Sequence, residues 1–276
     1  MKMQSGVACK ICASVSRERF RARILAKYDV TYYYCDSCGF LQTEEPYWLS
    51  ESYRSSLTTS DTGSLLRSLS LAEIVSVVLY FFFDKNSRYL DHAGGYGLFT
   101  RRMRDIGFDF YWRDRYSPNL LANGFEYKEA TGSVELITSF ESFEHFSDPL
   151  AEIEGMLAIS RNIIFTTELL PHPLPEPDEW YYYGLHHGQH ISFYSARTLA
   201  FIAGKYGLQF HAAHPVCILS KGSLQPAMLK LLLRLRRFGL FFYVKQRMKS
   251  RTVADSIELA ARSVANRQPE ERTFRA

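Results

Sequence analysis

The stretch Arg88-Tyr-Leu-Asp-His-Ala-Gly-Gly-Tyr-Gly-Leu-Phe-Thr100 decides the fold class of this chain. A short apolar strand ends at Asp91, and Gly94, Gly95 and Gly97 follow before an expected helix. Glycine lets the backbone turn sharply and approach a ligand where a Cβ would collide. In α/β sheets such a turn lies at the carboxyl ends of the strands, where ligands bind. The stretch therefore predicts a ligand-binding loop.

Short apolar strands and helices alternate on both sides of this loop. We expect strands at 88–91, 108–112, 134–140, 162–167 and 208–219. We expect helices at 65–83, with Asp61 or Thr62 as N-cap, and at 98–106, 117–122, 149–159 and 195–206. Strands separated by helices of this length predict a doubly wound, Rossmann-like α/β sheet.

Acidic residues near the loop are candidate ligand contacts. Asp91 ends the first strand, and Asp114 lies just past the second, where it can accept hydrogen bonds from two ribose hydroxyls. A dinucleotide fingerprint would have a glycine or alanine at position 100, where this chain has Thr100. A further strand leads directly into Phe140-Glu-Ser-Phe-Glu-His-Phe-Ser-Asp-Pro149.

Two of these segments resemble one enzyme family. Asp91-His-Ala-Gly-Gly-Tyr-Gly97 resembles motif I of class I S-adenosylmethionine-dependent methyltransferases, with Ala93 where the first glycine is usual. Phe140–Pro149 resembles the "FEHxxDP" stretch that lines the cofactor and substrate cleft of that family. The resemblance covers about residues 86–220 and implies S-adenosylmethionine as cofactor. The contacts that it implies are Asp91, Gly94, Gly95, Gly97, Asp114, Phe140 and Glu141. The alternative is a Rossmann-like domain with an empty or degenerate pocket.

Four of the five cysteines form two pairs with the spacing C-x2-C-x22-C-x2-C. In a chain without a signal-peptide-like start, this spacing favours a tetrahedral zinc site over disulfides. The predicted ligands are Cys9, Cys12, Cys35 and Cys38. All four positions of such a Zn²⁺ are used, so the zinc is expected to be structural, in a zinc ribbon. A redox dithiol or a coincidence would not explain the duplicated pair, and Cys217 is expected to be a buried core thiol.

The chain of 276 residues divides into four expected parts. These are a zinc-ribbon module at 1–47, a linker and helix at 48–85, an S-adenosylmethionine-binding domain at 86–222 and a basic helical tail at 223–276. Hydrophobic residues make up 46% of the chain and charged residues 22%, which excludes collagen-like and disordered classes. No uninterrupted apolar run reaches the roughly 18 residues of a membrane span, so we expect a cytoplasmic protein.

The zinc module narrows the expected acceptor. A four-cysteine domain before this fold is similar to the deoxysugar C-methyltransferases and their relatives, which carry a Tyr-x-Glu-His segment followed by Phe-Ser. The equivalent here is His187-Gly-Gln-His190, followed by Ile191–Ser195. Gln189 replaces the glutamate and His187 the tyrosine, and the large C-terminal domain of those enzymes would not fit in this chain. The resemblance implies a saccharide, nucleotide-sugar or related small metabolite as acceptor.

Histidines are the candidate catalytic groups. A hydroxyl, or a carbon next to a ketone, needs a base before it can attack the sulfonium methyl, and histidine has a pKa near working pH. His145 and His190 are expected to face the methyl group from two sides, as base or acceptor-orienting groups. Glu144 or Gln189 could orient one imidazole. For each histidine the alternative is a hydrogen-bonded structural role.

Between the strand at 162–167 and the histidines lies Pro171–Tyr183, which four prolines make stiff and extended. Its aromatic end, Trp180–Tyr183, is expected to turn ring faces toward the cleft, which suits carbohydrates and nucleobases. The alternative is packing of these rings onto the sheet.

The net charge of +4 is unevenly distributed. Trp180–Ala254 has no Asp or Glu and eleven Lys or Arg, whereas the remainder has 22 basic and 29 acidic residues. Residues 228–251 combine these charges with apolar residues, and Gly239 is expected to break their helix. The segment could pack on the domain, lie on the anionic inner membrane surface, or bind a partner or RNA phosphates.

Two rival functions remain at this stage. Some ribosomal RNA methyltransferases also place a four-cysteine module before this fold. However, no Asn-Pro-Pro-type motif follows the strand at 134–140, so we do not expect a nucleic-acid substrate. The second rival is a non-catalytic scaffold with the same fold. The sequence leaves the oligomeric state open.

Overall fold

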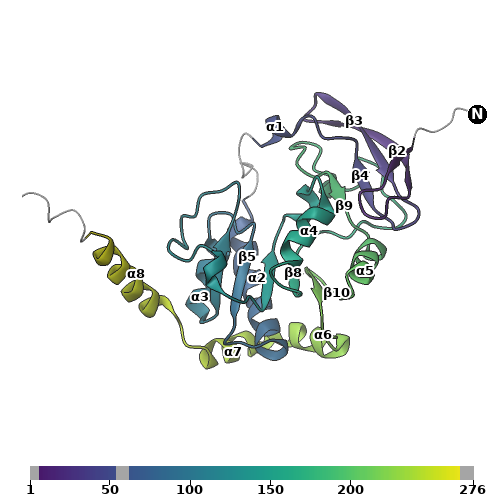
Figure 1. The fold of residues 1–276 in the computed structure, drawn as a ribbon. Helices are drawn as coiled ribbons and strands as arrows, with labels where there is room; N and C mark the ends of the chain where they lie inside the picture. The colour runs from purple at the N-terminus through teal and green to yellow at the C-terminus, as the bar shows by residue number, and fades with distance from the viewer. Residues whose placement is uncertain (1–5, 54–61, 268–276) are drawn as a thin grey trace, which may run out of the picture.

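The computed structural model describes residues 6–53 and 62–267, and its strands form two sheets (Figure 1). The first sheet has the order β1-β2-β3-β4-β9 and is antiparallel throughout. Its strands are β1 (Gly6–Ala8), β2 (Val15–Ile24), β3 (Tyr28–Tyr34), β4 (Leu41–Thr43) and β9 (Ser192–Phe193). The second sheet has the order β10-β11-β8-β7-β5-β6. Its strands are β5 (Arg88–His92), β6 (Asp109–Arg113), β7 (Leu136–Ser139), β8 (Ile163–Phe165), β10 (Gln209–Ala213) and β11 (Val216–Ser220).

The second sheet has the predicted doubly wound architecture. Strands β6, β5, β7 and β8 are parallel neighbours, and Asp91 on β5 is paired with Trp112 on β6 and Thr138 on β7. The single strand predicted at 208–219 is wrong, because β10 and β11 are two antiparallel strands joined at His214-Pro215. Proline has no N–H to donate to a sheet ladder, so the strand cannot continue through this position.

Alternating side chains of each strand enter two different cores. Leu136 and Ile164 face one core, whereas Ile137 and Ile163 face the other. The first core is covered by α2 (Ser64–Phe82) and α3 (Leu98–Ile106), and the second by α5 (Ala196–Lys205) and α4 (Pro149–Leu157). A parallel sheet buried on both faces needs apolar residues at successive positions, which explains the near-continuous apolar strands.

Helix starts follow local chemistry. Asp148 caps α4 by accepting from the N–H of Ala151, and Ser195 caps α5 by accepting from the N–H of Thr198. The predicted cap of α2 is wrong at Thr62, because the helix follows Gly63 without a side-chain cap. Asp61 lies outside the described residues.

The helix predicted at 117–122 is also wrong. The N–H groups of Leu120 and Leu121 both donate to the carbonyl oxygen of Tyr96 in the glycine loop. The Asn119 side chain accepts from the N–H of Ala122. This competing hydrogen bond closes a turn in place of a helical one.

By length and composition, α2 could cross a membrane, with a mean hydropathy of 1.8 over its apolar window. Its buried residues instead join the first core, together with Phe99 of α3 and Phe110 of β6. Within the described residues, 44% of this window is buried, so α2 is a core element between Leu71 and Leu79 and is partly exposed elsewhere.

The C-terminal helices close the same core from the amino ends of the strands. Leu229 and Leu232 of α6 (Pro226–Leu235) are buried there, as are Phe241 and Val244 of α7 (Phe241–Arg247). Gly239, with a φ of +98°, kinks the chain between these helices, as predicted.

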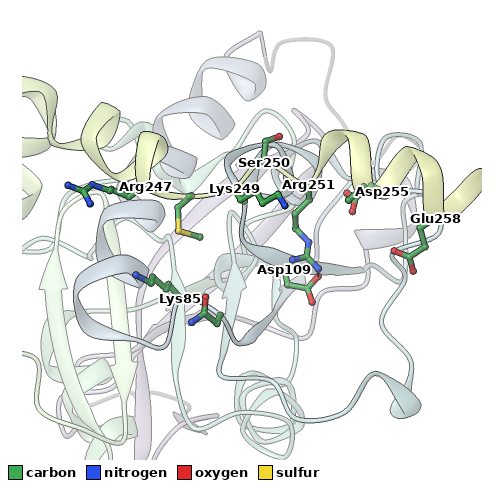
Figure 2. A pocket seen from close by; sticks show the side chains of 12 residues that line it. Lys85, Asp109, Arg247, Lys249, Ser250, Arg251, Asp255 and Glu258 are labelled. Carbon is green, nitrogen blue, oxygen red and sulfur yellow. Dashed lines mark ion pairs between the residues drawn. The ribbon is translucent and has the colours of Figure 1, made fainter.

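The last helix, α8 (Thr252–Arg267), projects from the body (Figure 1). At its base a hollow of about 500 Å³ lies between the Lys85–Asn86 turn and the Arg247–Glu258 segment (Figure 2). This hollow is at the amino ends of β5 and β6, the opposite edge of the sheet from the glycine loop.

Candidate functional site

The glycine loop follows β5 and is held against the end of β6. The Trp112 indole N–H donates to the Gly95 carbonyl at 2.9 Å, and the Gly95 N–H donates to the Asp114 carboxylate at 2.9 Å. Gly95 has a φ of +53°, and a Cβ built on it would meet no atom within 4 Å. The loop therefore keeps open space on the side of Gly95, as a cofactor cradle requires. A Cβ at Gly94 would instead lie 2.7 Å from the Asp91 carboxylate, which excludes a side chain there.

Ala93 occupies the left-handed region, with a φ of +57°. This is the position where motif I usually has a glycine, so the backbone keeps the conformation of the motif although the residue differs. An L-residue in this region costs about 1–2 kcal/mol.

Asp91 lies behind the loop and is 1% exposed. Its carboxylate accepts from the hydroxyl of Thr100 at 2.9 Å and from that of Thr138 at 3.0 Å. Burial raises its pKa to about 7, and the two hydroxyls lower it. Asp91 thus links the loop helix to β7, and its predicted contact with the cofactor remains a prediction.

Asp114 is placed where the sequence predicted, directly after β6. Besides Gly95, its carboxylate accepts from the N–H groups of Tyr116 and Ser117 at 2.7 and 2.8 Å. A carboxylate has about four acceptor positions, so one remains for a ribose hydroxyl. The geometry fits a nucleoside at this edge of the sheet.

The turn after β7 holds the next predicted contacts. The Phe140 ring packs edge-on against Phe99 of the loop helix, with centroids 4.8 Å apart. Glu141 has a φ of +48°, and its carboxylate accepts from Thr166 and lies 3.7 Å from the guanidinium of Arg67. This turn therefore stands beside the glycine loop, because β5 and β7 are neighbours.

Glu144 is fully buried in the short 3₁₀ helix η2 (Phe143–His145). Neither carboxylate oxygen makes a hydrogen bond within the described part of the chain. Burial and the nearby Glu141 raise its pKa to about 8, while the Tyr182 hydroxyl and Arg67 lower it. This is a buried, protonatable carboxyl at the carboxyl edge of the sheet, with the Tyr182 hydroxyl as its neighbour.

His145 and His190 come together as predicted, with ring centroids 5.1 Å apart. Donor atoms of Glu144 and both histidines lie within 4.8 Å of one another. Burial lowers the pKa of His145 to about 4 and that of His190 to about 3, so both imidazoles are neutral at pH 7. Their catalytic roles remain predictions.

The two other histidines of this segment, His186 and His187, have different surroundings. The N–H of Gln189 donates to Nδ1 of His187 at 3.1 Å, and the Gln189 amide donates to the Ser52 carbonyl at 2.8 Å. The Gln189 side chain therefore ties the histidine loop to α1 (Leu49–Ser52), while its backbone contacts the rings of His187 and His145. His186 is exposed at the rim.

The aromatic residues before the histidines have two different environments: some pack against the first sheet, and others lie at the histidine site. Tyr183 is fully buried among Phe20 and Tyr32 of the first sheet, the packing alternative. Tyr182 instead contacts His190, with ring centroids 4.6 Å apart, and Tyr181 is exposed. The expectation that all of these rings face the cleft is therefore wrong, because the first sheet needs apolar cover.

The four predicted zinc ligands form one cluster. The sulfur atoms of Cys9 and Cys38 are 3.5 Å apart, those of Cys12 and Cys35 are 3.4 Å apart, and all four lie within 4.8 Å of one another. A tetrahedral zinc with bonds of about 2.3 Å would place them roughly 3.8 Å apart, so the cluster fits this ion. Cys217 is buried away from it in β11, as expected.

The cysteine cluster belongs to the core beneath the histidine site. Cys35, Cys38 and Phe40 pack with Phe143 and Tyr194 in the second core. The Thr198 hydroxyl, in the first turn of α5, donates to the Cys38 carbonyl at 3.0 Å. The module is thus fixed to the sheet domain instead of being tethered by a linker.

Sequence reasoning missed several residues that shape the site. Tyr53 lies 2.9 Å from Nδ1 of His145, and nothing in its polar surroundings indicated this contact. Thr100 and Thr138 hold Asp91, and Thr100 was visible only as a departure from the dinucleotide fingerprint. Trp112 closes the loop from an ordinary strand position.

A family described as "Methyltransferase domain" matches residues 67–213, more than half of the chain. Similar solved structures include magnesium protoporphyrin IX methyltransferase (ChlM) from Synechocystis PCC 6803 with bound SAH, at 11% identity, 62% coverage of this chain, 90% of that chain and a TM-score of 0.40. The plantazolicin methyltransferase BpumL, in complex with a monoazolic desmethylPZN analog and SAH, has 14% identity, coverages of 73% and 88% and a TM-score of 0.45. No curated protein matches the sequence. The family match and the glycine loop show that the chain belongs to the methyltransferase-domain family, as an S-adenosylmethionine-dependent methyltransferase.

Proposed function

We propose that this methyltransferase transfers the methyl group of S-adenosylmethionine to a saccharide, a nucleotide-sugar or a related small metabolite. The observation that carries the proposal is the convergence of His145 and His190 after β7, at the same carboxyl edge of the sheet as the glycine loop. Two neutral imidazoles at this edge can orient a hydroxyl-rich acceptor by accepting its hydrogen bonds. In this proposal the zinc at the four cysteines is structural and the site faces the cytoplasm.

The cofactor half of the proposal is tested on the Asp114→Asn variant. The amide keeps the size of the side chain but cannot accept from three N–H groups and a ribose at once. We expect the affinity for S-adenosylhomocysteine, measured by calorimetry, to fall about 10–100-fold, or roughly 1.4–2.8 kcal/mol. Glu129→Gln, at the start of a short 3₁₀ turn away from the loop, is the control. Absence of heat with the wild-type protein would favour the non-catalytic scaffold.

The acceptor half is tested by mass spectrometry of a deletion strain. We expect a mass increment of one methyl group to disappear from nucleotide sugars or surface glycans and to return with the wild-type gene but not with the His190→Gln variant. An increment lost from RNA instead would support the RNA methyltransferase alternative.

We further propose that the α6–α7 segment contacts the anionic inner membrane surface. Its inner face is buried, but apolar side chains are exposed on both sides of the kink at Gly239: Met228, Leu231 and Leu235 at helical spacing on α6, then Phe238 and Phe242. Lys230, Arg234 and Arg237 lie between them, and the segment has no acidic residue. Exposed apolar side chains among cations suit a bilayer surface with anionic lipids.

Co-sedimentation of the full chain with vesicles tests this proposal. Because α6 and α7 complete the core, surface substitutions are preferable to truncation. We expect Phe238→Ser with Phe242→Ser to lose binding to phosphatidylglycerol-containing vesicles, whereas Val253→Ser with Ile257→Ser on the exposed face of α8 retains it. Equal sedimentation of all three proteins, or equal binding to neutral vesicles, would refute the membrane contact.

A further inference from the structure

We propose that Glu144, His145 and His190 form a second metal site, an open site for a divalent transition metal, separate from the four-cysteine cluster. The metal's task, binding the oxygen of the acceptor, rests on the proposed function, with the metal in place of the imidazole nitrogens as the group that contacts the acceptor. The site itself rests on the geometry of three side chains from two segments, η2 and the loop before β9.

The hydrogen bonds of the two histidines leave one nitrogen of each ring free to bind a metal. Nδ1 of His190 lies 2.6 Å from the carbonyl oxygen of Tyr182, and Nδ1 of His145 lies 3.1 Å from that of Gln189. A carbonyl oxygen can only accept, so Nδ1 of His190 carries the proton. Nδ1 of His145 also lies 2.9 Å from the Tyr53 hydroxyl, which can donate or accept, and the proposed site requires this hydroxyl to be the acceptor. In this arrangement each Nε2 has a free lone pair. An imidazole whose other nitrogen donates to a backbone carbonyl is the arrangement that metal-binding histidines usually have.

His187 shows the opposite arrangement in the same cluster. Its Nδ1 accepts the N–H of Gln189, so its proton is on Nε2 and that nitrogen cannot bind a metal. The loop thus distinguishes His190 from its neighbour by hydrogen bonding alone.

Glu144 is the third proposed ligand, and the burial of its carboxyl group favours a bound cation. Its carboxyl group is completely buried, and neither oxygen has a hydrogen bond within the described residues. A buried polar group without a partner costs several kcal/mol, and an ionised one costs more. The Arg67 guanidinium lies 3.7 Å from the carboxylate of Glu141. A bound cation would compensate the Glu144 carboxylate, whose favourable neighbours among the described residues are the Tyr182 hydroxyl and the Arg67 guanidinium.

The donor set indicates the class of metal. Two imidazoles with one carboxylate suit Zn²⁺, Fe²⁺, Mn²⁺ or Co²⁺, and three protein ligands leave positions for substrate. The three donor atoms lie within 4.8 Å of one another, so small side-chain rotations bring them to bonding distance of one ion. The four-cysteine cluster, in contrast, has no position left for substrate.

A metal here would make an acceptor hydroxyl nucleophilic. The hydroxyl oxygen binds the metal, its pKa falls, and its proton passes to water. The oxygen then attacks the methyl carbon, a carbon–oxygen bond forms, and the carbon–sulfur bond breaks. The sulfur takes the bonding electron pair and leaves as the uncharged thioether.

The test is a Co²⁺ titration of the full chain with zinc already bound at the cysteines. Zinc binds more tightly than cobalt to a thiolate site, so cobalt should enter only the second site. We expect one further equivalent of Co²⁺, with visible absorption of a nitrogen and oxygen environment and without thiolate charge-transfer bands. Glu144→Gln and His190→Gln should each weaken this binding at least 100-fold, whereas His186→Gln at the exposed rim should leave it unchanged.

The same variants separate this inference from the proposed function. Calorimetry with S-adenosylhomocysteine should give wild-type affinity for all of them, which also verifies that they are folded. The metal site is refuted if the wild-type protein takes up no second equivalent, or if both ligand variants retain it, while the nucleoside still binds. Loss of nucleoside binding by the wild-type protein would instead refute the methyltransferase function.

Discussion

The backbone N–H of Ile191 donates to the carbonyl oxygen of Glu144 at 2.9 Å. This hydrogen bond joins the histidine loop to the turn after β7, although the two residues are 47 positions apart. The next residues of the loop form β9, whose Phe193 pairs with Leu41 of β4 behind the cysteine cluster. Backbone hydrogen bonds therefore connect the cysteine module, the histidine loop and the Glu144 turn, and we expect a change in one of them to reach the others.

Removal of the zinc should therefore increase the mobility of the histidine loop as well as that of the two C-x2-C turns. We expect the Cys35→Ser variant to lose zinc and to expose the Ile191 amide, because Cys35 packs in the same hydrophobic core as Phe143 and Tyr194. Hydrogen exchange with mass spectrometry over residues 186–194, together with zinc content, checks this. Cys217→Ala, which removes a buried thiol outside the cluster, should keep both zinc and protection. Unchanged exchange in Cys35→Ser would show that the module is mechanically independent.

The buried carboxyl of Asp91 should make stability depend on pH. Its pKa is raised to about 7 in the folded chain, against about 3.9 when unfolded, so the folded state binds the proton more tightly. The free energy of unfolding should therefore fall as pH rises from about 4 to about 7, by up to roughly 4 kcal/mol relative to Asp91→Asn, and then level off. Urea titrations of both proteins across this range measure the difference. A difference that stays constant with pH would contradict the raised pKa.

Ala93→Gly should stabilise the protein. The left-handed backbone at this position is strained for alanine, and glycine relieves the strain while losing some chain entropy. We expect a gain of about 0.5–1 kcal/mol in the free energy of unfolding, without loss of affinity for S-adenosylhomocysteine. Ala158→Gly, at the right-handed end of α4, should instead be neutral or destabilising. A loss of stability in Ala93→Gly would mean that the Ala93 methyl packs favourably enough to offset the strain.

Asp255→Ala should detach α8 and destabilise the domain. The Asp255 carboxylate accepts two hydrogen bonds from Arg104, at 2.7 and 2.8 Å, and one from Arg101 at 2.8 Å. Arg104 is almost completely buried and would keep only Asp109 as a carboxylate partner, so we expect the loss of this buried ion pair to cost up to about 3 kcal/mol. Urea unfolding checks this, with Glu258→Ala as control. Glu258 lines the same hollow (Figure 2) but pairs on the exposed helix surface, so a change of at most about 1 kcal/mol is expected there. Equal effects of the two substitutions would refute the anchoring role of Asp255.

Much of the fold could be predicted from the sequence, because the sequence features that specify it lie within short segments of the chain. The glycine loop, the alternation of strands and helices, and the caps at Asp148 and Ser195 depend on residues within a few positions of one another. The helix expected at 117–122 failed where Asn119 and the carbonyl of Tyr96 offered better partners than a helical turn. The hydrophobic pattern of a segment does not show whether other hydrogen-bond partners will compete with the helical hydrogen bonds.

The sequence by itself determined the cysteine ligand set, the parallel sheet and the position of the cofactor loop, because spacing and strand order fix these features. Only the tertiary structure decided that Glu144, His145 and His190 meet, and that Tyr183 packs away from them. It also decided that Nε2 of His190 is the free ring nitrogen, because the carbonyl that accepts from Nδ1 belongs to Tyr182. The direction of a backbone carbonyl depends on how the two sheets pack, and no residue pattern encodes it.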